Sequence, residues 1–82
     1  MNEEVGQRVK ASELHPKQIV VIEPPDRDGM LITMHVVEAR DNLVVFYSGV
    51  LKMHVINVIG ADGELKDDRG RLVKVFEYLG EP

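Results

Sequence analysis

Residues 30–47, which read MLITMHVVEAR-DN-LVVFY, decide the fold of this chain because they predict two strands joined by a tight turn. Side chains of a strand point to alternate faces, so Met34 and Val36 share one face of the first strand. Asp41-Asn42 lies between the two strands, and both residue types tolerate the positive φ of a two-residue turn. The predicted cross-strand pairs are Arg40 with Leu43, Glu38 with Val45 and Val36 with Tyr47.

The rest of the chain repeats this pattern of short strands and turns. Nineteen of the 82 residues are β-branched and only three are alanine, a composition that favours strands over helices. Further strands are expected at residues 5–11, 18–23, 50–59 and 71–79, and turns at 24–29, 60–63 and 67–70. The sequence therefore predicts an all-β fold, a small antiparallel barrel of five to six strands with no long helix. By strand count and spacing it resembles the SH3-like class of barrels.

Length and composition give one domain and no covalent or metal support for it. We expect residues 1–4 to form a flexible N-terminus and residues 5–82 to form the single barrel domain. The absence of cysteine excludes disulfides, thiolate zinc sites, iron–sulfur clusters and a thiol nucleophile. The acidic N-terminus lacks the apolar stretch of a signal peptide, so a cytoplasmic location is expected.

No residue pattern in the chain predicts catalysis, a metal site or a cofactor. The two Met-His pairs, Met34-His35 and Met53-His54, lie in strands, where neighbouring side chains point to opposite faces and cannot join one ligand set. Neither serine stands in a Gly-x-Ser-x-Gly elbow, and the glycines form no phosphate-binding loop. The acidic residues between 62 and 68 lack the spacing of a calcium loop. We therefore expect a non-enzymatic protein without cofactors.

The middle of the chain predicts an interaction surface. Between residues 43 and 59 the only formally charged side chain is Lys52, and polar residues interrupt this segment before it reaches the length of a membrane span. The strands here are apolar on both faces, although a small barrel has one interior. An exposed apolar face marks an interface, so we expect a protein-binding module that forms homo-oligomers or binds a protein partner. The residues predicted to make the contact are Val45, Tyr47, Ile56 and Val58.

Binding of RNA or single-stranded DNA is the alternative. Single-strand binders combine aromatic side chains with basic groups, and Arg71, Lys74 and Tyr78 supply both in one segment. The formal net charge of −4 disfavours this alternative, because nucleic-acid-binding proteins usually carry an excess of basic residues.

Overall fold

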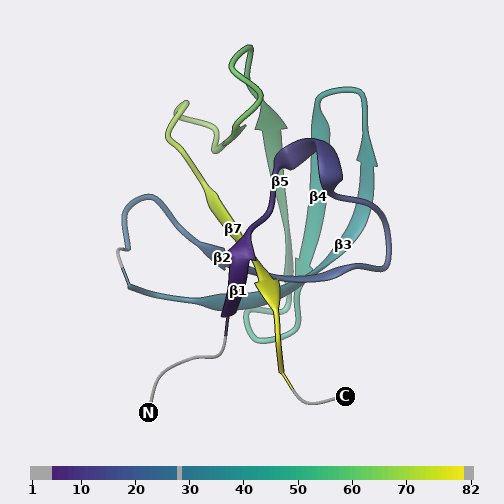
Figure 1. Ribbon diagram of the computed structural model, residues 1–82, viewed down its shortest axis with the longest axis vertical. Helices are drawn as coiled ribbons and strands as arrows, with labels where there is room; N and C mark the ends of the chain where they lie inside the picture. The colour runs from purple at the N-terminus through teal and green to yellow at the C-terminus, as the bar shows by residue number, and fades with distance from the viewer. Residues whose placement is uncertain (1–4, 28, 81–82) are drawn as a thin grey trace.

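The computed structural model describes residues 5–27 and 29–80, which form seven strands and one 3-10 turn (Figure 1). The flexible terminus predicted for residues 1–4 lies outside the described residues. The elements are β1 (Val5–Arg8), η1 (Ala11–Glu13), β2 (Ile19–Glu23), β3 (Ile32–Arg40), β4 (Leu43–Ser48), β5 (Met53–Ile59), β6 (Leu65–Lys66) and β7 (Lys74–Tyr78).

All seven strands belong to one antiparallel sheet in the order β1-β7-β2-β3-β4-β5-β6. The predicted all-β class is confirmed, and among the described residues the only helical element is the three-residue η1. The predicted count of five to six strands is too low because it missed β6. A strand of two residues shows no period-two pattern, and β6 lies between two turns.

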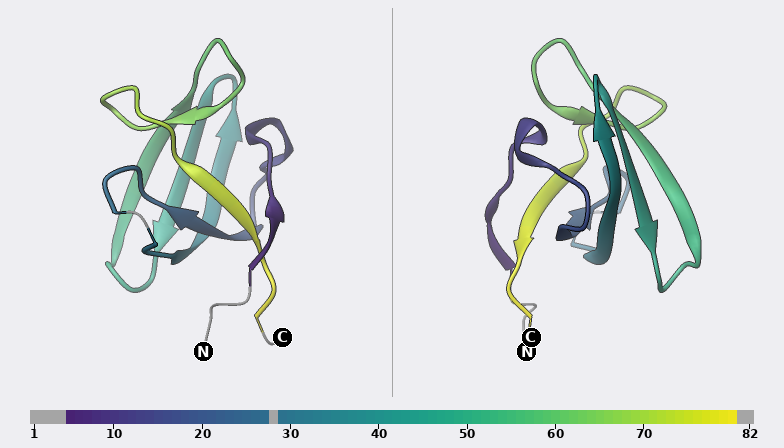
Figure 2. Two further views of the ribbon diagram at one scale, coloured as in Figure 1. Left: turned by 60° about the vertical axis from the view of Figure 1, so that its left-hand side comes forward. Right: turned by 90° about the vertical axis from the view of Figure 1, so that its right-hand side faces the viewer.

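The sheet folds back on itself without a closed strand ladder. In Figure 2, β1 and β7 lie on one side of the molecule and β4 and β5 on the other, with β2 and β3 joining them in the sheet order. β6 returns toward β7 through one isolated bridge between Lys66 and Leu72, and the N–H of Val73 donates to the carbonyl of Leu65 at 2.9 Å. The structure therefore shows a strongly folded seven-stranded sheet that is open beyond this bridge.

The hydrophobic core lies between the two sides of the folded sheet. Phe46 is fully buried at its centre, which is the expected position for the bulkiest apolar side chain of β4. Around it, buried residues from strands, from η1 and from adjoining segments pack as one cluster: Ala11, Leu14, Val20, Ile22, Met34, Val36, Val44, Leu65, Val73 and Val75. This single cluster determines which side of each strand is the inner one.

The β3–β4 hairpin forms as predicted at its turn but changes register further along. Asp41 has a φ of 55°, and the pairs Arg40–Leu43 and Glu38–Val45 are present. The predicted pair of Val36 with Tyr47 is wrong, since Val36 lies opposite Phe46. A β-bulge between Val36 and Glu38 adds one residue to β3, which lets Val36 enter the core while Glu38 stays on the outer side.

β5 begins three residues later than predicted because a turn occupies residues 49–52. The carbonyl of Ser48 accepts a hydrogen bond from the N–H of Lys52 at 2.7 Å, and Lys52 has a φ of 56°. The hydroxyl of Ser48 also accepts a hydrogen bond from the N–H of Leu51 at 3.0 Å. These bonds end β4 and hold the Leu51 backbone at the start of the next strand.

Candidate functional site

The four residues predicted as an interface lie together on the outer face of β4 and β5. Val45 is directly opposite Ile56 in the β4–β5 ladder. Tyr47, two residues after Val45, and Val58, two residues after Ile56, lie on the same face at opposite ends of this pair. Alternation predicts that Tyr47 and Phe46 face opposite ways, and burial of Phe46 in the core makes the Tyr47 side the outer one. We call Leu43, Val45, Tyr47, His54, Ile56 and Val58 the outer patch.

The outer patch includes apolar side chains that are exposed to solvent. Ile56 is 59% exposed and Val58 is 43% exposed, while Val45 and Tyr47 are half-buried between their neighbours. The rings of Tyr47 and His54 lie with centroids 5.0 Å apart at one end of the patch. No described segment covers these side chains, so the patch is a contiguous apolar strip open to solvent.

Two ion pairs lie at the border of the outer patch. Next to Val45 and Leu43 in the sheet, the guanidinium of Arg40 contacts the carboxylate of Glu38 at 2.7 Å. Beyond Val58, the ammonium of Lys66 contacts a carboxylate oxygen of Asp62 at 3.0 Å. Each of these two ion pairs is neutral as a unit.

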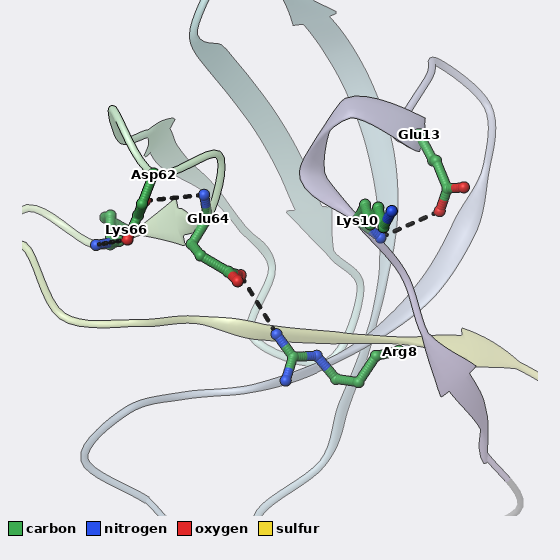
Figure 3. A network of polar contacts seen from close by, with 6 residues as sticks. All are labelled: Arg8, Lys10, Glu13, Asp62, Glu64 and Lys66. Carbon is green, nitrogen blue, oxygen red and sulfur yellow. Dashed lines mark hydrogen bonds and ion pairs between the residues drawn. The ribbon is translucent and has the colours of Figure 1, made fainter.

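A polar network joins the turn before β6 to β1 (Figure 3). Arg8 contacts the carboxylate of Glu64 at 3.4 Å, and Asp62 accepts a hydrogen bond from the N–H of Glu64 at 3.0 Å. This backbone bond and the Lys66 ammonium lower the pKa of the Asp62 carboxyl below its ordinary value. The network brings the two ends of the strand ladder together through exposed side chains, and we interpret it as structural.

The residues of the nucleic-acid alternative are only partly brought together. Lys74 and Tyr78 share the outer face of β7, with half-buried Phe76 between them and the Arg8 guanidinium 6.0 Å from the Phe76 ring. Tyr78 lies four residue steps along the strand from Lys74, a distance of about 13 Å. Arg71 precedes β7 and donates to the Asp67 carboxylate at 2.9 Å, which neutralises much of its charge.

The histidine–methionine pairs point to opposite faces, as the strand period predicts. Met34 is buried in the core, whereas His35 is exposed opposite Tyr47. Among residues 5–27 and 29–80, no three metal-ligating side chains lie close enough to hold an ion. Nor does the described part of the chain contain a helix that is long and apolar enough to cross a membrane.

Sequence reasoning missed three residues that matter at this surface. Leu43 and His54 complete the outer patch, and only the cross-strand register identifies them. Asn57 faces inward opposite Val44 and is 5% exposed. Its signal in the sequence is that it is the one polar residue in Val55-Ile56-Asn57-Val58-Ile59.

Comparisons with protein-family models, curated proteins and solved structures found no significant match to the chain.

Proposed function

We propose that this protein is a non-catalytic interaction module that associates with a second copy of itself through the outer patch. The observation that carries the proposal is the 59% exposure of Ile56 at the centre of a two-strand apolar strip. Apolar area removed from water on association contributes roughly 25 cal/mol per Å² before the entropic costs of binding. An apolar strip of this kind therefore favours association over solvation.

Self-association fits the charge distribution around the strip. In a two-fold dimer the same patch meets itself, so any net charge on the patch would repel its own copy. The outer patch carries no formally charged side chain, and the Arg40–Glu38 and Lys66–Asp62 pairs at its border are each neutral. These features support a second copy as the partner.

The test is the oligomeric state of the full chain with and without a charge at the patch centre. Sedimentation velocity over about 10–500 µM should show dimers for the wild type and monomers for Ile56→Lys, because two lysines would face each other across the interface. Thr33→Lys places the same charge on an exposed strand residue outside the patch and should leave the dimer intact. A wild type that stays monomeric at the highest concentration would refute the proposal, provided that circular dichroism shows all three proteins folded.

Single-stranded nucleic acid is the competing proposal, supported by Lys74, Phe76 and Tyr78 on one face with Arg8 beside the aromatic ring. Fluorescence anisotropy with a labelled oligouridine or oligothymidine in 50 mM salt measures it directly. Binding that weakens steeply with salt and is lost in Lys74→Glu would favour this function over protein binding. Lys17→Glu, at an exposed loop position, is the charge-matched control.

We also propose that the folded sheet is a small SH3-like barrel. The support is the Lys66–Leu72 bridge, which carries β6 back to the segment that continues into β7. Nuclear Overhauser contacts between backbone protons across this bridge in solution would support the proposal. If these contacts are absent in the folded protein, the fold is an open sheet.

A further inference from the structure

We infer that the open edge of β5, together with the cavity beside it, binds an extended aliphatic peptide segment of a partner protein. The inference concerns the edge and the inner side of β5. The proposed self-association uses the outer face, so either one can fail without the other.

The backbone of β5 has unpaired hydrogen-bonding groups along one edge. Ile59 donates its N–H to the carbonyl of Asn42, which lies on the β4 side. Backbone groups of an antiparallel strand alternate between its two sides, so the N–H and C=O of His54 and Ile56 point away from β4. On that side β6 pairs with only the last two residues of β5, and no other described strand pairs with β5 there.

This edge lacks the features that normally prevent strand addition. Native edge strands are usually short, charged, bulged or interrupted by proline. Residues 53–57, Met-His-Val-Ile-Asn, contain no formal charge and no proline, and the β4–β5 register is regular along them. An extended peptide can therefore continue the sheet here through main-chain hydrogen bonds.

A cavity of about 230 Å³ lies on the inner side of β5. Val55 and Asn57 contribute the β5 wall, and the other walls are mostly apolar. Cavities that hold whole small molecules are usually about 300–1,000 Å³, so this volume suits a side chain better than a cofactor. Two of the other lining residues, Asp26 and Asp67, are charged.

The amide of Asn57 gives the cavity a specific polar group. The side chain is 5% exposed, and no group among the described residues is hydrogen-bonded to its amide. No described side-chain polar atom is both sealed from solvent and unpaired, so the Asn57 amide opens into the cavity that it lines.

The edge and the cavity select the same ligand. In an antiparallel strand added to β5, the residue opposite Val55 points to the same side as Val55 and Asn57, toward the cavity. Its neighbours pair with His54 and Ile56. The mostly apolar walls of the cavity favour Val, Ile, Leu or Met at the inward position. In a second copy of the chain, the inward side chains of β5 line that copy's own cavity and cannot enter this one. A peptide from a partner protein therefore fits better than a second copy.

The experiment uses four capped heptapeptides, acetyl-Thr-X-Thr-X-Thr-X-Thr-amide with X as Val, Ile, Leu or Met, and NMR spectra of the full chain. Binding should shift the backbone amide signals of His54 and Ile56 and the side-chain amide signal of Asn57. N-methylation of the X residues should leave affinity within about twofold, because the N–H of an inward residue points away from β5. N-methylation of the Thr residues should weaken binding by more than about tenfold, since it removes the paired N–H groups.

Two variants separate this site from the outer patch. Asn57→Leu should weaken peptide binding by about fivefold or more, because its methyl groups take up part of the cavity that receives the inward side chain. Ile56→Lys keeps the backbone and changes only an outer side chain, so it should lose self-association and retain peptide binding. The inference is overturned if none of the four peptides shifts these signals at 2 mM, or if both methylation patterns bind equally. It is also overturned if the His54 and Ile56 amides of the free protein exchange with solvent as slowly as the Val55 amide.

Discussion

Replacing Asn57 by Leu should stabilise this protein, because Asn57 is a polar residue on the inner face of the sheet, where an apolar side chain is normally found. Asn57 is 5% exposed, so its amide is largely but not wholly removed from water. Burial of such a group without a hydrogen bond within the protein costs about 1–3 kcal/mol in protein mutational data, and Leu abolishes that cost. The adjacent cavity of about 230 Å³ accepts the extra methyl volume, so overpacking does not offset the gain. Because the amide opens into this cavity, we expect the gain in the free energy of unfolding to lie at the lower end of this range, about 1 kcal/mol. For a domain of this size that corresponds to a rise in Tm of about 4–8 °C.

The assay is urea unfolding followed by circular dichroism, with Ser48→Ala as the contrasting variant. Ser48 is also a buried polar residue, but its hydroxyl accepts the Leu51 N–H at 3.0 Å. Its loss should cost about 1 kcal/mol because a satisfied bond is removed. The two variants should therefore shift the midpoint in opposite directions at unchanged m-value. If Asn57→Leu lowers the midpoint as Ser48→Ala does, the Asn57 amide is hydrogen-bonded in the folded protein and the reasoning is wrong.

Three further predictions concern the core, the 67–70 loop and the polar network. Phe46→Ala should lower the free energy of unfolding by about 3–5 kcal/mol because the ring is fully buried, and a loss below 1 kcal/mol in urea titration would contradict that placement. Desolvation raises the pKa of Asp67, but hydrogen bonds from the backbone of Arg71 and Arg69 and from the Arg71 side chain lower it overall. The Asp67 carboxylate therefore stabilises the fold above the ordinary pKa of 3.8, and this stabilisation is lost as the pH falls through the lowered pKa. The stability difference between wild type and Asp67→Ala should thus be largest near pH 7 and shrink in acid; a pH-independent difference would refute it. Arg8→Ala should lower the free energy of unfolding by less than about 1 kcal/mol, since the ion pair of Arg8 with Glu64 is exposed. A larger loss in thermal unfolding would show that the packing of Arg8 over Phe76 contributes more than the ion pair.

The sequence predicted local features well and long-range ones poorly. The turn at Asp41-Asn42 and the first cross-strand pairs followed from residue types and spacing, because a two-residue turn fixes the register beside it. The bulge between Val36 and Glu38 broke that register. The bulge allows Val36 to pack in the core, and this core is formed by strands that are distant in the sequence. The two-residue β6 forms only because Leu65 enters that core and bonds back to Val73.

The candidate site shows the same division. From the uncharged middle of the chain, the sequence predicted an interface and named Val45, Tyr47, Ile56 and Val58 as its contact residues. It could not say which face was outward, because both faces of β4 are apolar. That choice was made by Phe46 entering the core.

By itself, the sequence determined the β class, the turns at 41–42, 60–63 and 67–70, and the concentration of apolar residues between Met30 and Ile59. These features depend on the period-two pattern and on the backbone preferences of neighbouring residues. The tertiary structure alone decided the strand order, in which β7 lies between β1 and β2, and the open edge of β5. It also decided that Asn57 faces a cavity. These features depend on contacts between segments far apart in the chain, where the free energy of packing one shared core selects among pairings that local preferences leave equal.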